Sequence, residues 1–344
     1  MQTRSAPATR SPRHAPSARQ NAPRRMTLGA VRSGIRPAPD RILVVGTEGV
    51  GKSTFAANAP RPIFIAAEDG IRHLDVASFP EPETFQDVLD AVAELTEVEH
   101  DFKTLVIDTL DWIEPLVWRA VCERAGWFDA AGNPDIEKPG YGKGYVAATE
   151  DWRRLLAALD RLRNTRQMEV ILLAHAAIKA FHNPAGGDYS RYECKLAKGA
   201  AALVKEWCDS NLFAVHEEFV TEAKGIARAK GVSTGRRVVK TERTAAWDAK
   251  TRHALSPELP LDYAEYAAAR SAGRPATPEQ LRDEIVAITA ALAPSPEAEA
   301  AIGAKLAACG DSVRDLARLL NVLRERLASV EATKTRDVPG DQEN

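Results

Sequence analysis

Short apolar runs alternate with helical patterns along the chain from Arg41 onward. The runs at residues 41–45, 62–67, 105–107, 170–174 and 212–215 have the length and composition of buried strands. Behind Thr84, an expected N-cap, apolar residues recur at helical spacing over 85–95, and a second helical stripe covers 152–162. This alternation predicts an α/β fold, in which a mostly parallel central sheet is covered by helices on both faces.

Polar residues follow three of these apolar runs. The run at 62–67 leads to Glu68, the run at 105–107 to Asp108, and the run at 170–174 to His175. Right-handed crossovers bring the carboxyl ends of parallel strands to one edge of a sheet, where ligands bind. We therefore expect the ligand site at the edge that these three residues share.

Composition divides the chain into a core and flanking segments. The core is expected over residues 39–270, with a hairpin or exposed loop at 225–240. Residues 1–38 are rich in Ala, Pro, Arg and Ser, lack a hydrophobic period, and are expected to be disordered. Beyond a linker at 271–278, helical patterns predict a small helical domain at 279–330, followed by a disordered tail at 331–344.

The sequence GTEGVGKS follows the first predicted strand and is a complete GxxxxGK[ST] motif. Glycines let the backbone curl so that several N–H groups converge on a triphosphate. Lys52 would reach the β- and γ-phosphates, and the Ser53 hydroxyl would bind Mg²⁺. The residues expected to bind ATP here are Gly46, Thr47, Glu48, Gly49, Val50, Gly51, Lys52, Ser53 and Thr54.

Two carboxylates are candidates for the chemistry of hydrolysis. Asp108 ends TLVID, in the position of the aspartate that holds Mg²⁺ in P-loop ATPases. The next residue is Thr109, so the group that activates water must come from elsewhere. Glu68 is the candidate base, because its strand delivers the carboxylate to the same edge. The alternative is a helix-capping or surface acid, since AEDG also has the composition of a turn.

Six segments carry a resemblance to a known family: GTEGVGKST, FIAAEDG, FKTLVIDTLDWIE, ILLAHAAIKAF, EWCDSNLF and RTAAWDAKTRHALSPELPLDY. The order P-loop, strand ending in Glu, strand ending in Asp, strand ending in a polar residue resembles the RecA-type ATPase core. More closely, residues 41–263 resemble phage-encoded core-only RecA-like ATPases linked to single-strand annealing recombination. The resemblance implies an oligomeric ATPase that uses Mg²⁺, binds single-stranded DNA and promotes annealing or strand pairing.

The same resemblance implies roles for three further residues. His175 lies where RecA-type proteins keep a polar sensor of the γ-phosphate; the alternative is a histidine that only caps a strand. Lys250 and Arg252, in AKTR, resemble paired cations that a RecA-type subunit inserts into its neighbour's ATP site. Thr251 departs from the AKNR of the family, although both cations remain. A solvated basic loop is the alternative for this segment.

Charge is unevenly distributed on a chain of net charge −2. No acidic residue precedes Asp40, and residues 224–252 carry nine Lys or Arg against Glu242 and Asp248. Such patches suit a polyanion, although a solvated charged face is the alternative. Cations that neutralise phosphates, interleaved with aromatics that stack on bases, are typical of single-strand binding. One candidate stretch holds Lys179, Phe181, Tyr189, Arg191, Tyr192, Lys195, Lys198 and Lys205, and the loop 126–144 holds Trp127, Lys138, Tyr141 and Lys143.

Several classes of protein are disfavoured. No apolar run approaches the roughly 20 residues of a membrane helix, so no membrane partner is expected. The four cysteines form no CxxC pair, which fits a reducing cytoplasm, that of the host if the chain is phage-encoded. A nucleotide or metabolite kinase is disfavoured because the sequence shows no Arg-rich lid pattern. A GTPase is disfavoured because no NKxD motif occurs.

One alternative function stays open. It is a RecA-fold ATPase that loads or remodels a protein partner, such as a replicative helicase, without recombinase activity. A single-strand-binding protein or another replisome component is a further candidate partner.

Overall fold

The computed structural model describes residues 26–31, 38–183, 186–221, 230–272, 278–292 and 294–336. Pro37–Pro275 forms one compact unit, and the helices that follow Ala276 belong to another. Leu28–Ala30 forms a single 3₁₀ turn. Of the segment 1–38, which was expected to be disordered, only residues 26–31 and Ala38 are described.

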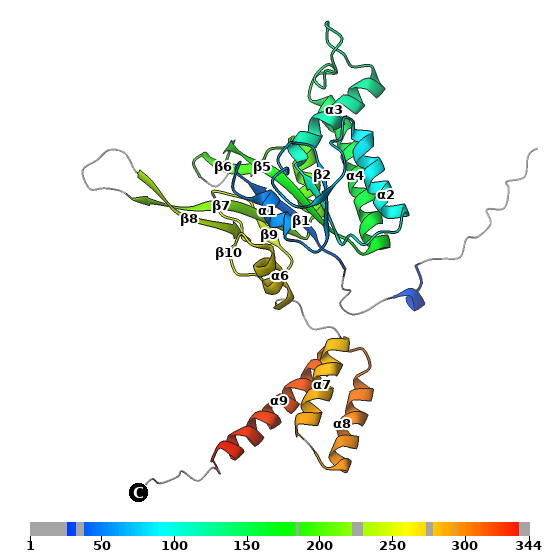
Figure 1. Ribbon diagram of the computed structural model, residues 1–344, viewed down its shortest axis with the longest axis vertical. Helices are drawn as coiled ribbons and strands as arrows, with labels where there is room; N and C mark the ends of the chain where they lie inside the picture. The colour runs from blue at the N-terminus through cyan, green and yellow to red at the C-terminus, as the bar shows by residue number, and fades with distance from the viewer. Residues whose placement is uncertain are drawn as a thin grey trace, which may run out of the picture. The chain divides into compact units, whose positions relative to one another are not determined.

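The core unit is built on a mostly parallel sheet (Figure 1). Its parallel strands are β1 (Arg41–Gly46), β2 (Pro62–Ala66), β3 (Ala77–Ser78), β4 (Thr104–Asp108), β5 (Glu169–Phe181) and β7 (Ser210–Thr221). They lie in the order β7-β1-β5-β4-β2-β3, so that one strand, β5, separates β1 from β4. This arrangement confirms the predicted α/β fold with a mostly parallel sheet.

Antiparallel strands extend the sheet at two places. β8 (Lys230–Lys240) and β9 (Lys250–Thr251) pair with β7, and β10 (Glu258–Pro260) pairs with β8. β6 (Tyr189–Cys194) pairs with the end of β5. The β7–β8 hairpin accounts for the hairpin expected near 225–240, although residues 222–229 lie outside the described part of the chain.

Helices cover both faces of the sheet, as expected. One layer holds α2 (Phe85–Glu97), α3 (Leu110–Ala125), α4 (Lys143–Arg166) and α5 (Lys198–Trp207). Within this layer, α4 contacts each of the other three helices. The other face is packed by α1 (Lys52–Ala57) and α6 (Tyr263–Ala272). In β1, Leu43 and Val45 face the first layer, whereas Ile42 and Val44 face the second. Burial on both faces explains why the strand is continuously apolar.

Two features of this unit differ from the sequence-based expectation. β5 does not end at His175 but continues to Phe181, because β6 takes over as its partner where β1 stops. His175 pairs with Gly46 of β1, and Ala176 already pairs with Cys194 of β6. Helix α3 was not among the predicted elements; it contains Pro115, and an internal proline normally argues against a helix.

The second unit contains α7 (Pro278–Leu292), α8 (Pro296–Cys309) and α9 (Val313–Arg336). Its buried core comprises Leu281, Ile285, Ile302, Leu316, Leu320 and Leu323. Helix α9 runs past residue 330, into the segment for which no structure was expected. None of the helices in the described ranges is both long enough and apolar enough to cross a membrane.

Candidate nucleotide site and a second cavity

The glycines of the P-loop occupy positions that other residues would disturb. Gly46 ends β1, and a Cβ there would come within 2.6 Å of the Ala214 carbonyl oxygen of β7. Gly49 and Gly51 have φ values of 69° and 104°, in the region that favours glycine. The backbone therefore turns sharply between β1 and α1, as a phosphate-binding loop requires.

A cavity of about 640 Å³ opens beside this loop. The residues that line it are Glu48, Gly49, Gly51, Lys52, Ser53, Thr54, Glu68, Gly70, His73, Trp112, His175, Lys195 and Arg237. The structure thus brings the P-loop, Glu68 and His175 to one cavity at the carboxyl ends of β1, β2 and β5, although β5 itself continues further. Asp108 is buried at the end of the neighbouring strand β4.

Lys52 lies buried at the start of α1. Its Nζ donates to the carbonyl oxygens of Thr47, at 3.0 Å, and Gly46, at 3.3 Å. Burial lowers the pKa of Lys52, and the negative charges of Asp108 and Asp111 oppose that shift. The ammonium group is therefore held over the loop, in the place from which it can contact a bound phosphate chain.

Asp108 provides the test of whether Mg²⁺ fits this site. Both of its carboxylate oxygens are buried, and neither has a hydrogen-bond partner by geometric criteria among the described residues; the same is true of the Thr109 hydroxyl. Burial raises the pKa of Asp108, while the nearby Ser53 hydroxyl and Lys52 counteract the shift. An unpaired buried carboxylate is costly, and a hard cation held by carboxylate and hydroxyl oxygens would satisfy it. Ser53 and Asp108 therefore fit a Mg²⁺ site.

Glu68 lies just beyond β2 with its side chain on the cavity. Its backbone carbonyl accepts a hydrogen bond from Gly70 N–H at 2.8 Å, so AEDG is indeed a turn. Burial raises the pKa of Glu68, against the opposing effect of His175 and Lys52. A carboxylate with a raised pKa beside a phosphate site suits a general base.

Asp111 is a site residue that sequence reasoning missed. It lies in the first turn of α3 and is buried, with only 3% of its side chain exposed. Its carboxylate accepts hydrogen bonds from the backbone N–H of His175 and contacts the His175 ring Nδ1, both at 2.9 Å. Burial alone would raise the pKa of Asp111, but these hydrogen bonds outweigh burial and lower that pKa. Asp111 therefore orients the imidazole and leaves Nε2 as the ring nitrogen for a ligand. Its position three residues after Asp108 was the only signal in the sequence.

Two cations of the cavity also differ from expectation. Lys195, which the sequence placed in a candidate DNA-binding stretch, lines the nucleotide cavity, with Nζ 3.8 Å from Asp111 Oδ2. Its backbone N–H donates to the His175 carbonyl at 2.9 Å, which draws this residue toward the strand ends. Arg237 of β8 lines the same cavity; the sequence marked it only as part of a basic stretch.

Lys250 and Arg252 lie away from the P-loop of their own chain. β9 pairs with the amino end of β7, where Thr251 is opposite Ser210, whereas the P-loop begins opposite Ala214. The two places are separated by roughly 13 Å along β7, at about 3.3 Å per residue. Lys250 Nζ donates to the Lys205 carbonyl at 2.5 Å, and Arg252 pairs with Asp209 at 2.8 Å. Burial and the charge of Arg252 both lower the pKa of Lys250.

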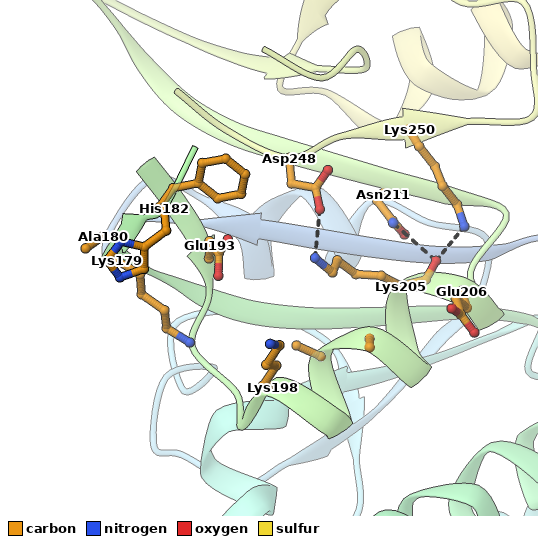
Figure 2. A pocket seen from close by; sticks show the side chains of 13 residues that line it. Lys179, Ala180, His182, Glu193, Lys198, Lys205, Glu206, Asn211, Asp248 and Lys250 are labelled. Atoms are coloured by element: carbon orange, nitrogen blue, oxygen red, sulfur yellow. Dashed lines mark hydrogen bonds and ion pairs between the residues drawn. The ribbon is translucent and has the colours of Figure 1, made fainter. Parts of the chain in front are cut away.

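A second cavity, of about 710 Å³, runs along α5 from the β5–β6 hairpin to the start of β7 (Figure 2). The residues that line it are Lys179, Ala180, Phe181, His182, Glu193, Lys198, Ala201, Ala202, Lys205, Glu206, Asn211, Asp248 and Lys250. Lys179 donates to the Cys194 and Leu196 carbonyls, and Lys205 pairs with Asp248 at 2.7 Å. The side chain of Lys198 is exposed and makes no hydrogen bond or ion pair with any described residue.

The structure separates the predicted DNA-contacting residues into two groups. Arg191 is only 4% exposed and packs over the Phe181 ring, and Tyr192 packs on Phe213, so these two residues support the fold. In the other predicted loop, Trp127 packs against the core, whereas Tyr141 is fully exposed.

Among the comparisons with known proteins, one matches most of the core. A family model described as "AAA domain" matches residues 38–253, the span that holds the P-loop, Glu68, Asp108, His175 and the AKTR segment. No curated protein matches the chain. Among solved structures, the crystal structure of the RadB recombinase is similar, with 16% identity and a TM-score of 0.35 over 60% of this chain and 82% of that one.

Proposed function

The chain belongs to the AAA-domain family of that model, and we propose that its P-loop core is RecA-like and hydrolyses ATP in a manner coupled to binding single-stranded DNA. In this proposal the protein acts as an oligomer and promotes annealing or pairing of strands.

The observation that carries the ATPase assignment is the convergence on one cavity. The P-loop, Glu68 and His175 line it, and the unpaired Asp108 is buried beside Ser53. Bound Mg²⁺ would neutralise charge that builds on the phosphates during transfer. Of the chain's own groups, Lys52 holds the phosphates, Glu68 orients and deprotonates the attacking water, and the ring that Asp111 orients donates to the γ-phosphate.

The second cavity supports the proposed contact with single-stranded DNA. Lysines from the β5–β6 hairpin, α5 and β9 border it, and the rings of Phe181 and His182 also line it. His182 lies at one end of the cavity (Figure 2). Lysines neutralise phosphates and rings stack on unpaired bases, which together suit a strand of any sequence. Because β5 passes from the nucleotide cavity at His175 to this cavity at Lys179, one strand joins the two sites.

The position of Lys250 and Arg252 supports their proposed action on a neighbouring subunit. They lie at the opposite end of the sheet strands from their own P-loop, so they cannot reach the phosphates bound by their own chain. Arg252 keeps 56% of its side chain exposed despite its ion pair with Asp209. A cation supplied by a neighbour would make hydrolysis depend on assembly.

DNA binding can be tested by fluorescence anisotropy with a labelled oligonucleotide over a range of salt concentrations. Lys198→Ala should weaken binding to all sequences and reduce the slope of log affinity against log salt by about one. Lys305→Ala is the matched control, because Lys305 is also exposed but lies on α8 of the other unit.

The wild type decides between the two functions. If it hydrolyses ATP but binds no single-stranded DNA, the recombinase proposal is wrong. An ATPase that remodels a protein partner then becomes the better account, and its mark would be stimulation of hydrolysis by that protein in the absence of DNA.

A further inference from the structure

Arg237 is a cation of the nucleotide cavity that neither the P-loop motif nor the predicted neighbour cations explain. It lies on β8, in the antiparallel extension of the sheet, and its side chain lines the cavity together with Lys52 and Glu68. The P-loop motif does not reveal Arg237, because this residue is distant in sequence and reaches the cavity through the β7–β8 pairing.

The guanidinium group lies close to Gly51. A Cβ added to Gly51 would come within 2.8 Å of Arg237 Nη1, and the next side chain in reach is that of Leu261 at 3.6 Å. Gly51 precedes Lys52, in the part of the loop whose N–H groups converge on phosphate. The guanidinium therefore stands on the same side of the loop as the expected phosphate chain.

The backbone of Arg237 is held from both sides. It is paired with His216 of β7, and its carbonyl accepts a hydrogen bond from Leu261 N–H at 3.0 Å. Its guanidinium, by contrast, has no hydrogen bond or ion pair with any residue that the structure describes. The neighbouring Arg236 shows the usual arrangement for an exposed arginine, since it pairs with Glu217 at 3.4 Å.

We propose that Arg237 binds the phosphates of the nucleotide held by its own chain. The inference rests on the proposed ATP site and adds a residue to it. A guanidinium presents a planar set of donors that matches phosphate oxygens, and such charge-assisted hydrogen bonds are strong. Affinity for ATP is then complete within one subunit, and the cations of a neighbour are needed only for hydrolysis.

The test is equilibrium binding of Mg²⁺·ATP, ADP and adenosine to the full-length protein, measured by calorimetry. Arg237→Ala and Arg237→Gln should both weaken ATP and ADP binding by at least about tenfold, the effect expected for a lost hydrogen bond to a charged group. Arg237→Lys should be intermediate, because it keeps the charge and loses the planar fork. Arg236→Ala is the matched control and should bind within about twofold of the wild type.

Three results bear on the proposal in different ways. ATP binding by Arg237→Gln within twofold of the wild type would overturn it, as would an equal loss of adenosine affinity, which would place the side chain on the base. If the wild type binds ATP and Lys52→Ala does not, the ATP site itself is supported. Either of these two results for Arg237→Gln then rejects only the proposed role of Arg237. If the wild type itself binds no ATP, both the proposed function and this inference fail.

Discussion

At the scale of single residues, the nucleotide cavity combines groups that the sequence could identify with groups that it could not. Lys52 and Ser53 follow from a motif with fixed spacing, because adjacent residues of one loop keep their relation in space. Asp108 follows from the apolar strand that it ends. Asp111 and Arg237 depend on the path of α3 and on the β7–β8 pairing. Nothing in their local sequence separates them from ordinary surface charges.

Glu68 is predicted to control the rate of hydrolysis without controlling ATP affinity. Glu68→Gln should lower kcat by about 10²–10⁴-fold, the usual contribution of a general base, and should leave ATP binding intact. Burial raises the pKa of Glu68, so the wild-type rate should fall with decreasing pH at a higher pH than for an ordinary glutamate. Steady-state rates across pH would check this.

Asp69→Asn is the control for Glu68, since Asp69 is its neighbour, is exposed and pairs with Arg72. It should keep the wild-type rate and pH profile. A Glu68→Gln variant with wild-type kcat would show that the base lies elsewhere.

Glu114 of α3 gives a prediction about stability. It is 5% exposed, both of its carboxylate oxygens accept the Ala197 N–H at 3.0 Å, and burial raises its pKa to about 7. Because this exceeds the unfolded value, the folded state holds the extra proton between about pH 4.5 and 7. The free energy of unfolding should therefore fall as pH rises through that window.

The Glu114→Gln variant lacks that titration. Its free energy of unfolding, relative to that of the wild type, should therefore rise by on the order of 1–3 kcal/mol between pH 5 and pH 7.5. Urea unfolding at both pH values measures it. Glu123→Gln, at an exposed position of the same helix, should show no such gain. If the free energy of unfolding depends on pH equally in the wild type and in Glu114→Gln, the raised pKa of Glu114 is refuted.

At the scale of elements, the sequence predicted best where one pattern alone decides the structure. The strands β1, β2 and β4 are buried on both faces and appear as plain apolar runs. The continuation of β5 past His175 escaped prediction, because its last residues are half-exposed and are held by β6. Edge pairing of this kind depends on a partner that the local sequence does not reveal.

The start of α2 is an element boundary that the sequence predicted correctly. Thr84 is the N-cap, with its hydroxyl accepting from Asp87 N–H at 3.2 Å, and Asp87 accepts in return from Thr84 N–H at 2.8 Å. Thr84→Ala should destabilise the core unit by about 1 kcal/mol, while Thr84→Ser should be close to the wild type. Chemical denaturation monitored by circular dichroism distinguishes them; equal stability of all three proteins would exclude a capping role.

At the scale of the whole molecule, the P-loop core has a nucleotide cavity near the carboxyl ends of its sheet strands and a cationic pair at their amino ends. This separation is what an assembly of like subunits would use, since each chain would lend its pair to the next. The helical unit that follows has its own buried core, and the sequence predicted it from the change in pattern after the core.

The most direct test of the account is ATP hydrolysis with and without single-stranded DNA. The proteins to compare are the wild type, Lys52→Ala, the Lys250→Ala/Arg252→Ala double variant, and an equal mixture of the last two. We predict that DNA stimulates the wild type, and that the double variant binds ATP but loses the stimulation. The mixture should recover part of it, because an intact P-loop can meet an intact cationic pair. A rate that DNA leaves unchanged, together with a double variant as active as the wild type, would contradict the account.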